Sequence, residues 1–333
     1  MKLPTEDIPY EIRRNPLQIS LFKNTKIVDH KLILDQPVDK ALKSFVVKSS
    51  PTTPTTSYKY VYVYRTMSLD NYGHFIIDNL IPLYKMIVLT QGYDFNRDDV
   101  LFCFLKAPKE TVKQQAISEK QNKLLEAFSS HPIRFIEEMP DIAIDNLVVP
   151  FLGLGTSISF CKWQEYKHHQ LNEQISSLFL QNFRKHLLDH FQIQIKAPNK
   201  RVFLSRKKAK HRKVLNEDAF TAEHQILPVT FENKTIQEEL QLFSDAAITV
   251  TPYGAGIVGS FFQQPQSRCI IIHPNGFDER YDFPQIYTLF LKRLDVNVQI
   301  YHSITGKPGS NIFRNRDSHI RIDLNDFNKK LNI

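Results

Sequence analysis

The chain has 333 residues, of which 42% are hydrophobic and 23% charged. This balance excludes a globally disordered chain and predicts one large or two ordinary domains. The formal net charge of +8 favours anionic partners such as nucleotides and phospholipid head groups. No nucleic-acid-binding motif accompanies that charge, so we expect no nucleic acid partner.

The sequence contains no run of about 18 apolar residues, so no membrane-spanning helix is predicted. The N-terminal stretch MKLPTEDIPYEIRRNP lacks the apolar core of a signal peptide. We therefore expect a cytoplasmic protein. Alternatives are a place at the periphery of the inner membrane, or export as a secreted bacterial effector. Cys103, Cys161 and Cys269 lie far apart in the sequence and are expected to be buried and reduced.

In the first half of the chain, β-rich runs alternate with a helical pattern. Residues 58–65 (YKYVYVYR) are apolar on both faces, as buried parallel strands are, and similar runs begin at Val100 and Asn146. Helices are expected over residues 76–90 and within residues 164–191. This order predicts an N-terminal α/β domain over residues 1–195.

The second half alternates more regularly. Strands are expected at residues 201–206, 226–232, 247–252 and 268–274, with helices between them at residues 216–224, 235–246 and 255–263. This order predicts a Rossmann-like parallel sheet over residues 196–305, followed by a segment 306–333 that returns to the first domain. The chain is thus expected to form two Rossmann-like α/β domains whose parallel sheets face a central cleft, where ligands bind.

A glycine-rich turn lies in TPYGAGIVGSF, residues 251–261. Gly254, Gly256 and Gly259 have the G-x-G-x-x-G spacing of a dinucleotide-binding turn, at a helix start whose N–H groups suit a phosphate. However, the turn follows the third strand of its half, and the next strand ends at His273 instead of a ribose-binding acid. A phosphate site is therefore favoured. An NAD(P)- or flavin-dependent oxidoreductase, or a tight turn without a ligand, remains an alternative.

A basic segment, FLSRKKAKHRKVLNE, follows the strand expected at residues 201–206. Open α/β sheets bind ligands at strand carboxyl ends, and Arg206 and Arg212 can each give forked hydrogen bonds to a diphosphate. Asn216 and Glu217 then start the next helix. A charged surface loop without a ligand is the alternative.

A histidine and an aspartate share one helical face in DNYGHFIIDNLIPLYKMI. His74 and Asp78 are four residues apart, beside Gly73. A histidine next to a carboxylate can act as a general base, because the carboxylate fixes its tautomer and raises its basicity. A surface ion pair or a helix-capping cluster is the alternative.

Three segments occur in the order of a known set of motifs. NYGHFIIDNLIPLYK contains an asparagine–aromatic–glycine–histidine motif, RVFLSRKKAKHRKVLNE an S-R…R…N-E motif, and ELQLFSDAAITVTPYGAGIVGSFF a G-A-G turn after a strand. Together they resemble glycosyltransferase family 61 over roughly residues 58–274. The resemblance implies a GT-B fold and inverting transfer from a nucleotide sugar, often a UDP-sugar, to a hydroxyl of a glycan, lipid-linked or protein acceptor.

The resemblance also assigns residues to two sides of the reaction. It places Asn71, Gly73, His74 and Asp78 on the acceptor side. The donor side would consist of Arg206, Arg212, Asn216, Glu217, Tyr253, Gly254, Ala255 and Gly256. Two positions depart from the family: Tyr253 stands where a histidine usually precedes G-A-G, and Glu239 stands where a glutamine is common. Tyrosine can still donate a hydrogen bond but does not titrate readily at neutral pH.

Inverting transfer requires a base for the acceptor and stabilisation of the leaving diphosphate. We expect His74, oriented by Asp78, to be the base, with Asp78 itself as the alternative. Arg206, Arg212 and the helix start at residues 254–256 would neutralise the diphosphate. Because the chain has no D-x-D motif, we expect neither a metal nor a cofactor beyond the nucleotide sugar. A catalytically degenerate protein that binds nucleotide sugar or anionic lipid, and peripheral contact with an anionic membrane, remain open.

Overall fold

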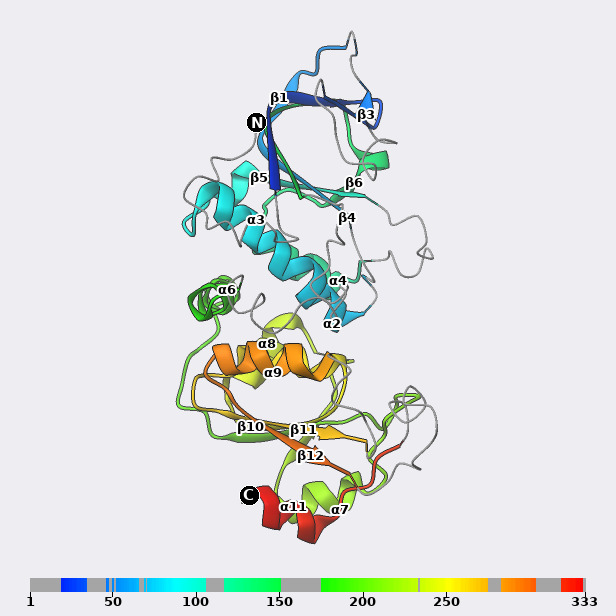
Figure 1. Ribbon diagram of the computed structural model, residues 1–333, viewed down its shortest axis with the longest axis vertical. Coiled ribbons are helices and arrows are strands. Elements are labelled where there is room, and N and C mark those ends of the chain that lie inside the picture. The colour runs from blue at the N-terminus through cyan, green and yellow to red at the C-terminus, as the bar shows by residue number, and fades with distance from the viewer. Residues whose placement is uncertain are drawn as a thin grey trace. The chain divides into compact units, whose positions relative to one another are not determined.

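The computed structural model describes residues 19–34, 46–47, 50, 52–65, 69, 71–105, 117–150, 175–232, 234–274, 283–303 and 319–331. The chain divides into two compact units, Met1–Ile175 and Ser176–Ile333, which are coloured blue to green and green to red in Figure 1. Among the described residues, no helix combines the length and the apolar character that crossing a membrane requires.

The first unit contains a seven-stranded mixed sheet. Its strand order is β3-β2-β1-β7-β4-β5-β6. The strands are β1 (Ile19–Val28), β2 (Lys31–Ile33), β3 (Val46–Val47), β4 (Thr56–Arg65), β5 (Val100–Leu105), β6 (Arg134–Phe135) and β7 (Ile142–Pro150). Strands β7, β4, β5 and β6 are parallel, as expected for β4, β5 and β7, whereas β1 runs antiparallel to both β2 and β7.

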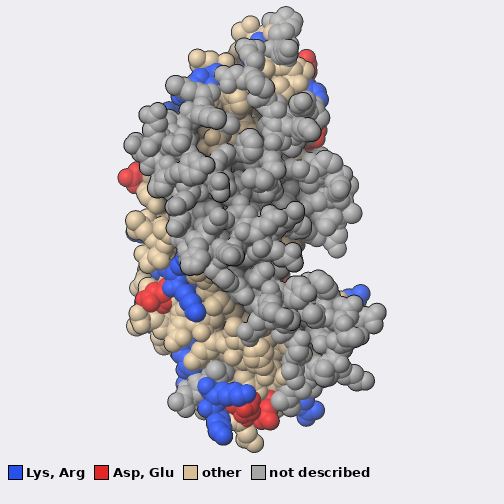
Figure 2. Space-filling view, viewed as in Figure 1, with Lys and Arg blue, Asp and Glu red and all other residues tan. Residues whose placement is uncertain are grey.

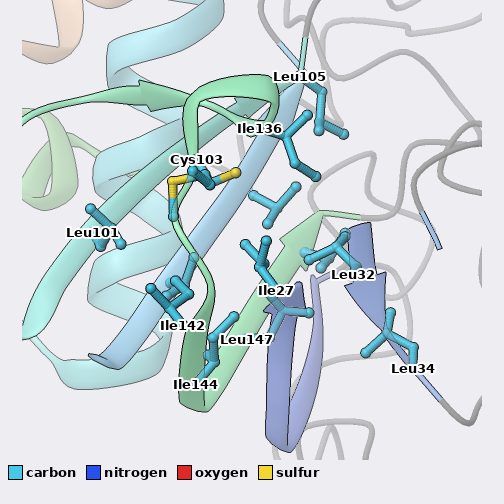
Figure 3. Close-up of a cluster of buried hydrophobic side chains, with 14 residues drawn as sticks. Ile27, Leu32, Leu34, Leu101, Cys103, Leu105, Ile136, Ile142, Ile144 and Leu147 are labelled. Atoms are coloured by element: carbon cyan, nitrogen blue, oxygen red, sulfur yellow. The ribbon is translucent and has the colours of Figure 1, made fainter. Parts of the chain in front are cut away.

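Residues 61–64 of β4 and all of β5 are buried, which explains why their sequences do not alternate. Tyr62 and Tyr64 point to one face, where their hydroxyls bond Thr90 and the Asp78 carbonyl. On the other face, Val63 and Cys103 belong to an apolar cluster with residues of β1 and β2, including Ile27 and Leu32 (Figure 3). Burial raises the pKa of the Cys103 thiol above its usual range.

The cysteine prediction is confirmed for the described cysteines. Cys103 and Cys269 are both buried free thiols, and Cys161 lies outside the described residues.

The helices of the first unit follow β4 and β5. A continuous helical segment consists of α2 (Tyr72–His74), the π-helix η2 (Phe75–Leu80) and α3 (Ile81–Gln91). The 3₁₀ turns η3 (Arg97–Asp99) and η5 (Ile136–Glu138) and the helix α4 (Glu119–Glu126) complete the unit. The helix expected over residues 76–90 is therefore present, but its first turns are wider than an α-helix.

The second unit contains a five-stranded sheet in which every neighbouring pair is parallel. Its order is β12-β11-β10-β8-β9. The strands are β8 (Lys200–Leu204), β9 (Leu227–Val229), β10 (Ala246–Pro252), β11 (Arg268–His273) and β12 (Asn297–His302). Counted along the unit, the order is 2-1-3-4-5, the doubly wound arrangement with a topological switch between its first and third strands. The Rossmann-like prediction for this half is confirmed.

Helices cover both faces of this sheet. They are α6 (Ser177–His190), α7 (Glu217–Glu223), α8 (Ile236–Ser244), the 3₁₀ helix η7 (Ala255–Phe262), α9 (Phe283–Arg293) and α11 (Leu324–Leu331). Figure 1 shows α8 and α9 on one side of the sheet and α7 and α11 on the other. The helix expected at residues 255–263 is present as the 3₁₀ helix Ala255–Phe262, which lies against Phe243 of α8.

The first difference from the expected domain boundaries concerns α6. It belongs to the second unit, so the chain divides after residue 175 and not after residue 195. The reason is a specific contact: Arg184 Nη1 donates to the carbonyls of Gln263 and Leu294, at 2.8 and 3.2 Å.

The second difference concerns the C-terminal segment. Its described part, residues 319–331, packs on the second unit instead of returning to the first, because Ile320 and Phe327 lie in the core of that unit.

The first part of the helical region expected within residues 164–191, up to residue 174, lies outside the described residues.

Candidate functional site

The first group of candidate residues lies at the start of the helical segment of the first unit. His74 Nδ1 is 2.6 Å from Asp78 Oδ2, and the Asp78 side chain is fully buried while 24% of the His74 side chain is exposed. Asn71 is the N-cap: its Oδ1 accepts hydrogen bonds from the backbone N–H groups of Gly73 and His74, at 3.0 and 3.3 Å. The four predicted acceptor-side residues are thus brought together, with Asn71 orienting the helix start.

A proline lies shortly after the π-helical turn that carries Asp78. Pro82 has no N–H group and cannot bond the carbonyl of Asp78, which lies four residues earlier. The Tyr64 hydroxyl donates to that carbonyl instead. The Ile81 N–H bonds the carbonyl of Ile76, five residues back. Such wide turns are often found at functional sites.

The contact between His74 and Asp78 defines what the pair can do. Next to an ionised carboxylate, which only accepts hydrogen bonds, Nδ1 is the ring atom that carries the hydrogen of this contact. The ring atom that can then take a proton is Nε2. Asp78 is buried and engaged with the imidazole, which favours His74 over Asp78 as the group that removes a proton.

The second group of candidate residues lies at the switch point of the second sheet. Arg206 and Arg212 follow β8, and Gly254 follows β10, the strand next to it. A Cβ atom on Gly254 would lie 3.0 Å from Arg212 Nη1 and 3.3 Å from Arg206 Nη1. Open α/β sheets bind ligands at this place, so two guanidinium groups meet where an anion is expected.

Arg212 is held in place by the turn that follows β10. Its Nη1 donates to the Tyr253 carbonyl at 2.8 Å, and its guanidinium carbon lies 5.6 Å from the centre of the Tyr253 ring. The backbone of Arg212 has φ +59°, a left-handed conformation that is uncommon for a side chain of this size. Gly254 has φ +149° and ψ −168°, a conformation essentially reserved for glycine.

A histidine lies beside Tyr253, although none precedes the G-A-G turn. The rings of Tyr253 and His273 are 5.3 Å apart at an angle of 62°. Burial lowers the pKa of His273 to about 3, and the nearby His302 acts in the same direction. His273 is therefore neutral at physiological pH.

Asn216 and Glu217 occupy different environments at the start of α7. The Asn216 side chain bonds both backbone groups of Ile322: its Nδ2 donates to the carbonyl at 2.8 Å, and its Oδ1 accepts from the N–H at 3.1 Å. Glu217 is buried, and this burial raises the pKa of its carboxyl group, while the Ser205 hydroxyl and the Lys207 ammonium oppose the rise. Asn216 thus faces the C-terminal segment.

The remaining glycines of the turn have different neighbours. A Cβ on Gly259 would lie 2.0 Å from the Phe243 ring, which agrees with a packing position. A Cβ on Gly256 would lie 3.3 Å from Leu204 Cδ1, at the end of β8. Ala255 is the first residue of η7. Of the three glycines, Gly254 is therefore the one at which the backbone can come close to a ligand.

The lysines next to Arg206 form ion pairs. Lys207 and Lys208 pair with Asp218 and Glu232, and on the face in Figure 2 basic side chains lie beside acidic ones. Within the described ranges, no group of three or more His, Cys, Asp and Glu side chains could hold a metal ion.

The sequence did not predict that the C-terminal segment lies beside this region. The segment around Ile320 pairs with the chain after Arg212, and no local pattern links residues so far apart.

Comparison with known proteins agrees with this geometry. The family model described as Glycosyltransferase 61 matches residues 72–271, which is 200 of the 333 residues and includes every candidate residue of both groups except Asn71. No curated protein shows a significant match to the chain. The matched region starts at the residue after Asn71 and ends within β11. The chain belongs to glycosyltransferase family 61.

Proposed function

We propose that the protein is an inverting glycosyltransferase that moves a sugar from a UDP-linked donor to a hydroxyl of a glycan, lipid-linked or protein acceptor. Family membership makes it a glycosyltransferase with a sugar donor and an acceptor. One observation supports a donor that carries a diphosphate: the guanidinium groups of Arg206 and Arg212 converge on Gly254 at the switch point of a doubly wound sheet.

The donor would be held through its diphosphate. Each guanidinium can form two parallel hydrogen bonds to phosphate oxygens, and charge-assisted bonds of this kind are roughly twice as strong as neutral ones. Gly254 has no side chain that would keep a phosphate at a distance. As the bond to the sugar breaks, negative charge builds up on the diphosphate, and both arginines stabilise it.

The acceptor would be activated by His74. The acceptor oxygen attacks the anomeric carbon on the face opposite the diphosphate, and its proton moves to His74 Nε2. Asp78 stabilises the imidazolium that forms, at 2.6 Å from Nδ1. Attack from the opposite face inverts the anomeric configuration. Asp78 as the base is less favoured because its side chain is fully buried.

Two further parts of the proposal rest on family membership and charge. The family supports a GT-B arrangement, in which the donor and acceptor groups would share one cleft. Two arginines can replace a divalent cation at the diphosphate, so we expect transfer to continue in excess chelator. Activity that is lost in chelator and restored by Mn²⁺ or Mg²⁺ would refute this expectation. We place the reaction in the cytoplasm, with contact to an anionic membrane when the acceptor is lipid-linked.

The proposal is tested by thermal unfolding in the presence of UDP, GDP, ADP, NAD and NADP. A ligand at 100 times its dissociation constant stabilises the folded state by about 2.7 kcal/mol, so binding raises the melting temperature measurably. We expect a shift with UDP and none with NAD or NADP. A shift with a dinucleotide alone would favour an oxidoreductase. UDP binding without transfer or slow hydrolysis of a UDP-sugar would indicate a binding protein.

A further inference from the structure

The C-terminal segment lies alongside the chain that follows Arg212. The Ile320 N–H donates to the Lys213 carbonyl, and the Leu215 N–H donates to the Ile320 carbonyl, each at 2.8 Å. Val214 and Ile320 form a parallel β-bridge. Residues 213–215 therefore have a strand-like neighbour from more than a hundred residues further along the chain.

Asn216 extends this pairing by one more step. Its side-chain amide makes a two-sided contact with the Ile322 backbone, with Nδ2 to the carbonyl at 2.8 Å and Oδ1 to the N–H at 3.1 Å. A primary amide can reproduce both halves of a peptide–peptide pairing because it has a donor and an acceptor on one planar group. Glutamine carries the same group on a side chain that is one methylene longer.

The C-terminal segment is itself firmly anchored. Ile320, Ile322 and Phe327 are at most 2% exposed and belong to the core of the second unit. The Phe327 ring lies 4.9 Å from both the Phe220 ring of α7 and the Tyr301 ring of β12. The segment can therefore act as a fixed support for the residues that it contacts.

Arg212 needs such a support. Its backbone has φ +59°. For a residue other than glycine this conformation is strained, and it persists only when the surrounding structure holds it. The Tyr253 carbonyl holds the guanidinium end of the residue. The backbone end continues directly into Lys213, the first residue that pairs with the C-terminal segment.

We infer that residues 319–322 position Arg212 for the donor diphosphate, and that Asn216 acts as a positioning residue through its bond to Ile322. The inference rests on the proposed function, because it assigns Arg212 to the donor. In this role Asn216, the asparagine of the N-E motif, holds the loop that contains Arg212 and does not contact the nucleotide.

A double-mutant cycle on the full chain tests this role, with UDP as the probe and the dissociation constant from calorimetry as the readout. Arg212→Ala removes the supported group, Asn216→Ala removes the support, and a third protein carries both changes. Asn328→Ala is the matched control: Asn328 also joins the C-terminal segment to α7, with Nδ2 3.0 Å from Glu223 Oε1, and this bond does not involve residues 212–216. Melting temperatures of all variants show whether they fold.

If Asn216 acts through Arg212, its substitution matters only while Arg212 is present. We expect Asn216→Ala to weaken UDP binding roughly tenfold in the wild-type background and less than twofold in the Arg212→Ala background, because interacting residues are not additive. Asn328→Ala should stay within about twofold of wild type. If Asn216→Ala does not fold, Asn216→Asp, which keeps the acceptor but loses the donor, should give a smaller loss with the same dependence on Arg212.

The outcomes separate the inference from the proposed function. Equal losses in both backgrounds would mean that Asn216 contacts the nucleotide itself, and no loss in either background would mean that it has no role; both results overturn the inference alone. A wild-type protein that binds neither UDP, GDP nor ADP overturns the proposed function, and the inference with it.

Discussion

Arg212 donates a hydrogen bond of 2.8 Å to the backbone carbonyl of Tyr253, across 41 residues of sequence. The bond joins the loop after β8 to the turn after β10, the two segments that flank the switch point of the second sheet. Because the carbonyl accepts on one side of the guanidinium, the remaining N–H groups of Arg212 have a defined direction. The same turn contains Gly254, whose missing side chain leaves room beside both arginines.

The first prediction concerns Gly254. Gly254→Ala forces a residue with a Cβ into a glycine-only conformation, which costs roughly 1 to 3 kcal/mol, and puts that Cβ 3.0 Å from Arg212 Nη1. We expect a lower melting temperature and UDP binding weakened about tenfold or more. Gly256→Ala is the control, because its Cβ would meet Leu204 Cδ1 at 3.3 Å and Thr251 Oγ1 at 3.7 Å, with neither arginine within 4 Å. Wild-type UDP affinity in Gly254→Ala would contradict the assignment of the turn.

The second prediction concerns stability without a change in binding. Gly259→Ala places a methyl group 2.0 Å from the ring of Phe243, which is 2% exposed and packed against Phe231. Overpacking of a buried site costs typically about 1 to 3 kcal/mol. The free energy of unfolding should fall by that amount and recover in part when Phe243→Leu is added. An unchanged free energy of unfolding in the single variant would show that η7 and α8 are not in contact as described.

The third prediction concerns pH. Burial lowers the pKa of His273 from 6.5 to about 3, so between these values the unfolded chain binds a proton that the folded protein excludes. The contribution of His273 to stability is complete above pH about 6.5 and is lost as the pH falls, by up to about 1.4 kcal/mol per pH unit.

Replacement by an apolar ring of similar size tests this linkage. In His273→Phe, the free energy of unfolding should fall less steeply between pH 6.5 and 3 than in the wild type. Denaturant unfolding at several pH values gives the two curves. Parallel curves would mean that the folded protein protonates His273 as readily as the unfolded chain does.

Much of the second sheet, and the pair of His74 and Asp78 in the first unit, could be predicted from the sequence because their signals are local. The alternation of β-rich and helical segments gave the parallel sheet, and the spacing of His74 and Asp78 gave a contact that the structure shows at 2.6 Å. Residues four apart on a helix must be neighbours, whatever the rest of the chain does.

The parts that could not be predicted depend on long-range partners. An amphipathic pattern shows that α6 has an apolar face but not that Arg184 bonds the carbonyls of Gln263 and Leu294. The bond of Asn216 to Ile322 likewise joins residues 106 apart. The π-helical turn was missed for a different reason: hydrophobic periodicity predicts a helix but does not distinguish a π-helical turn from an α-helical one.

The central claim, that His74 activates the acceptor while the arginines bind the donor, is tested most directly by single-turnover transfer and UDP titration of His74→Ala. Removing a general base lowers the rate typically 10²- to 10⁴-fold, and we expect a loss of that size with UDP affinity within about twofold of wild type. The double variant Arg206→Ala/Arg212→Ala should instead lose UDP binding. Wild-type turnover in His74→Ala, or unchanged UDP affinity in the double-arginine variant, would contradict the account.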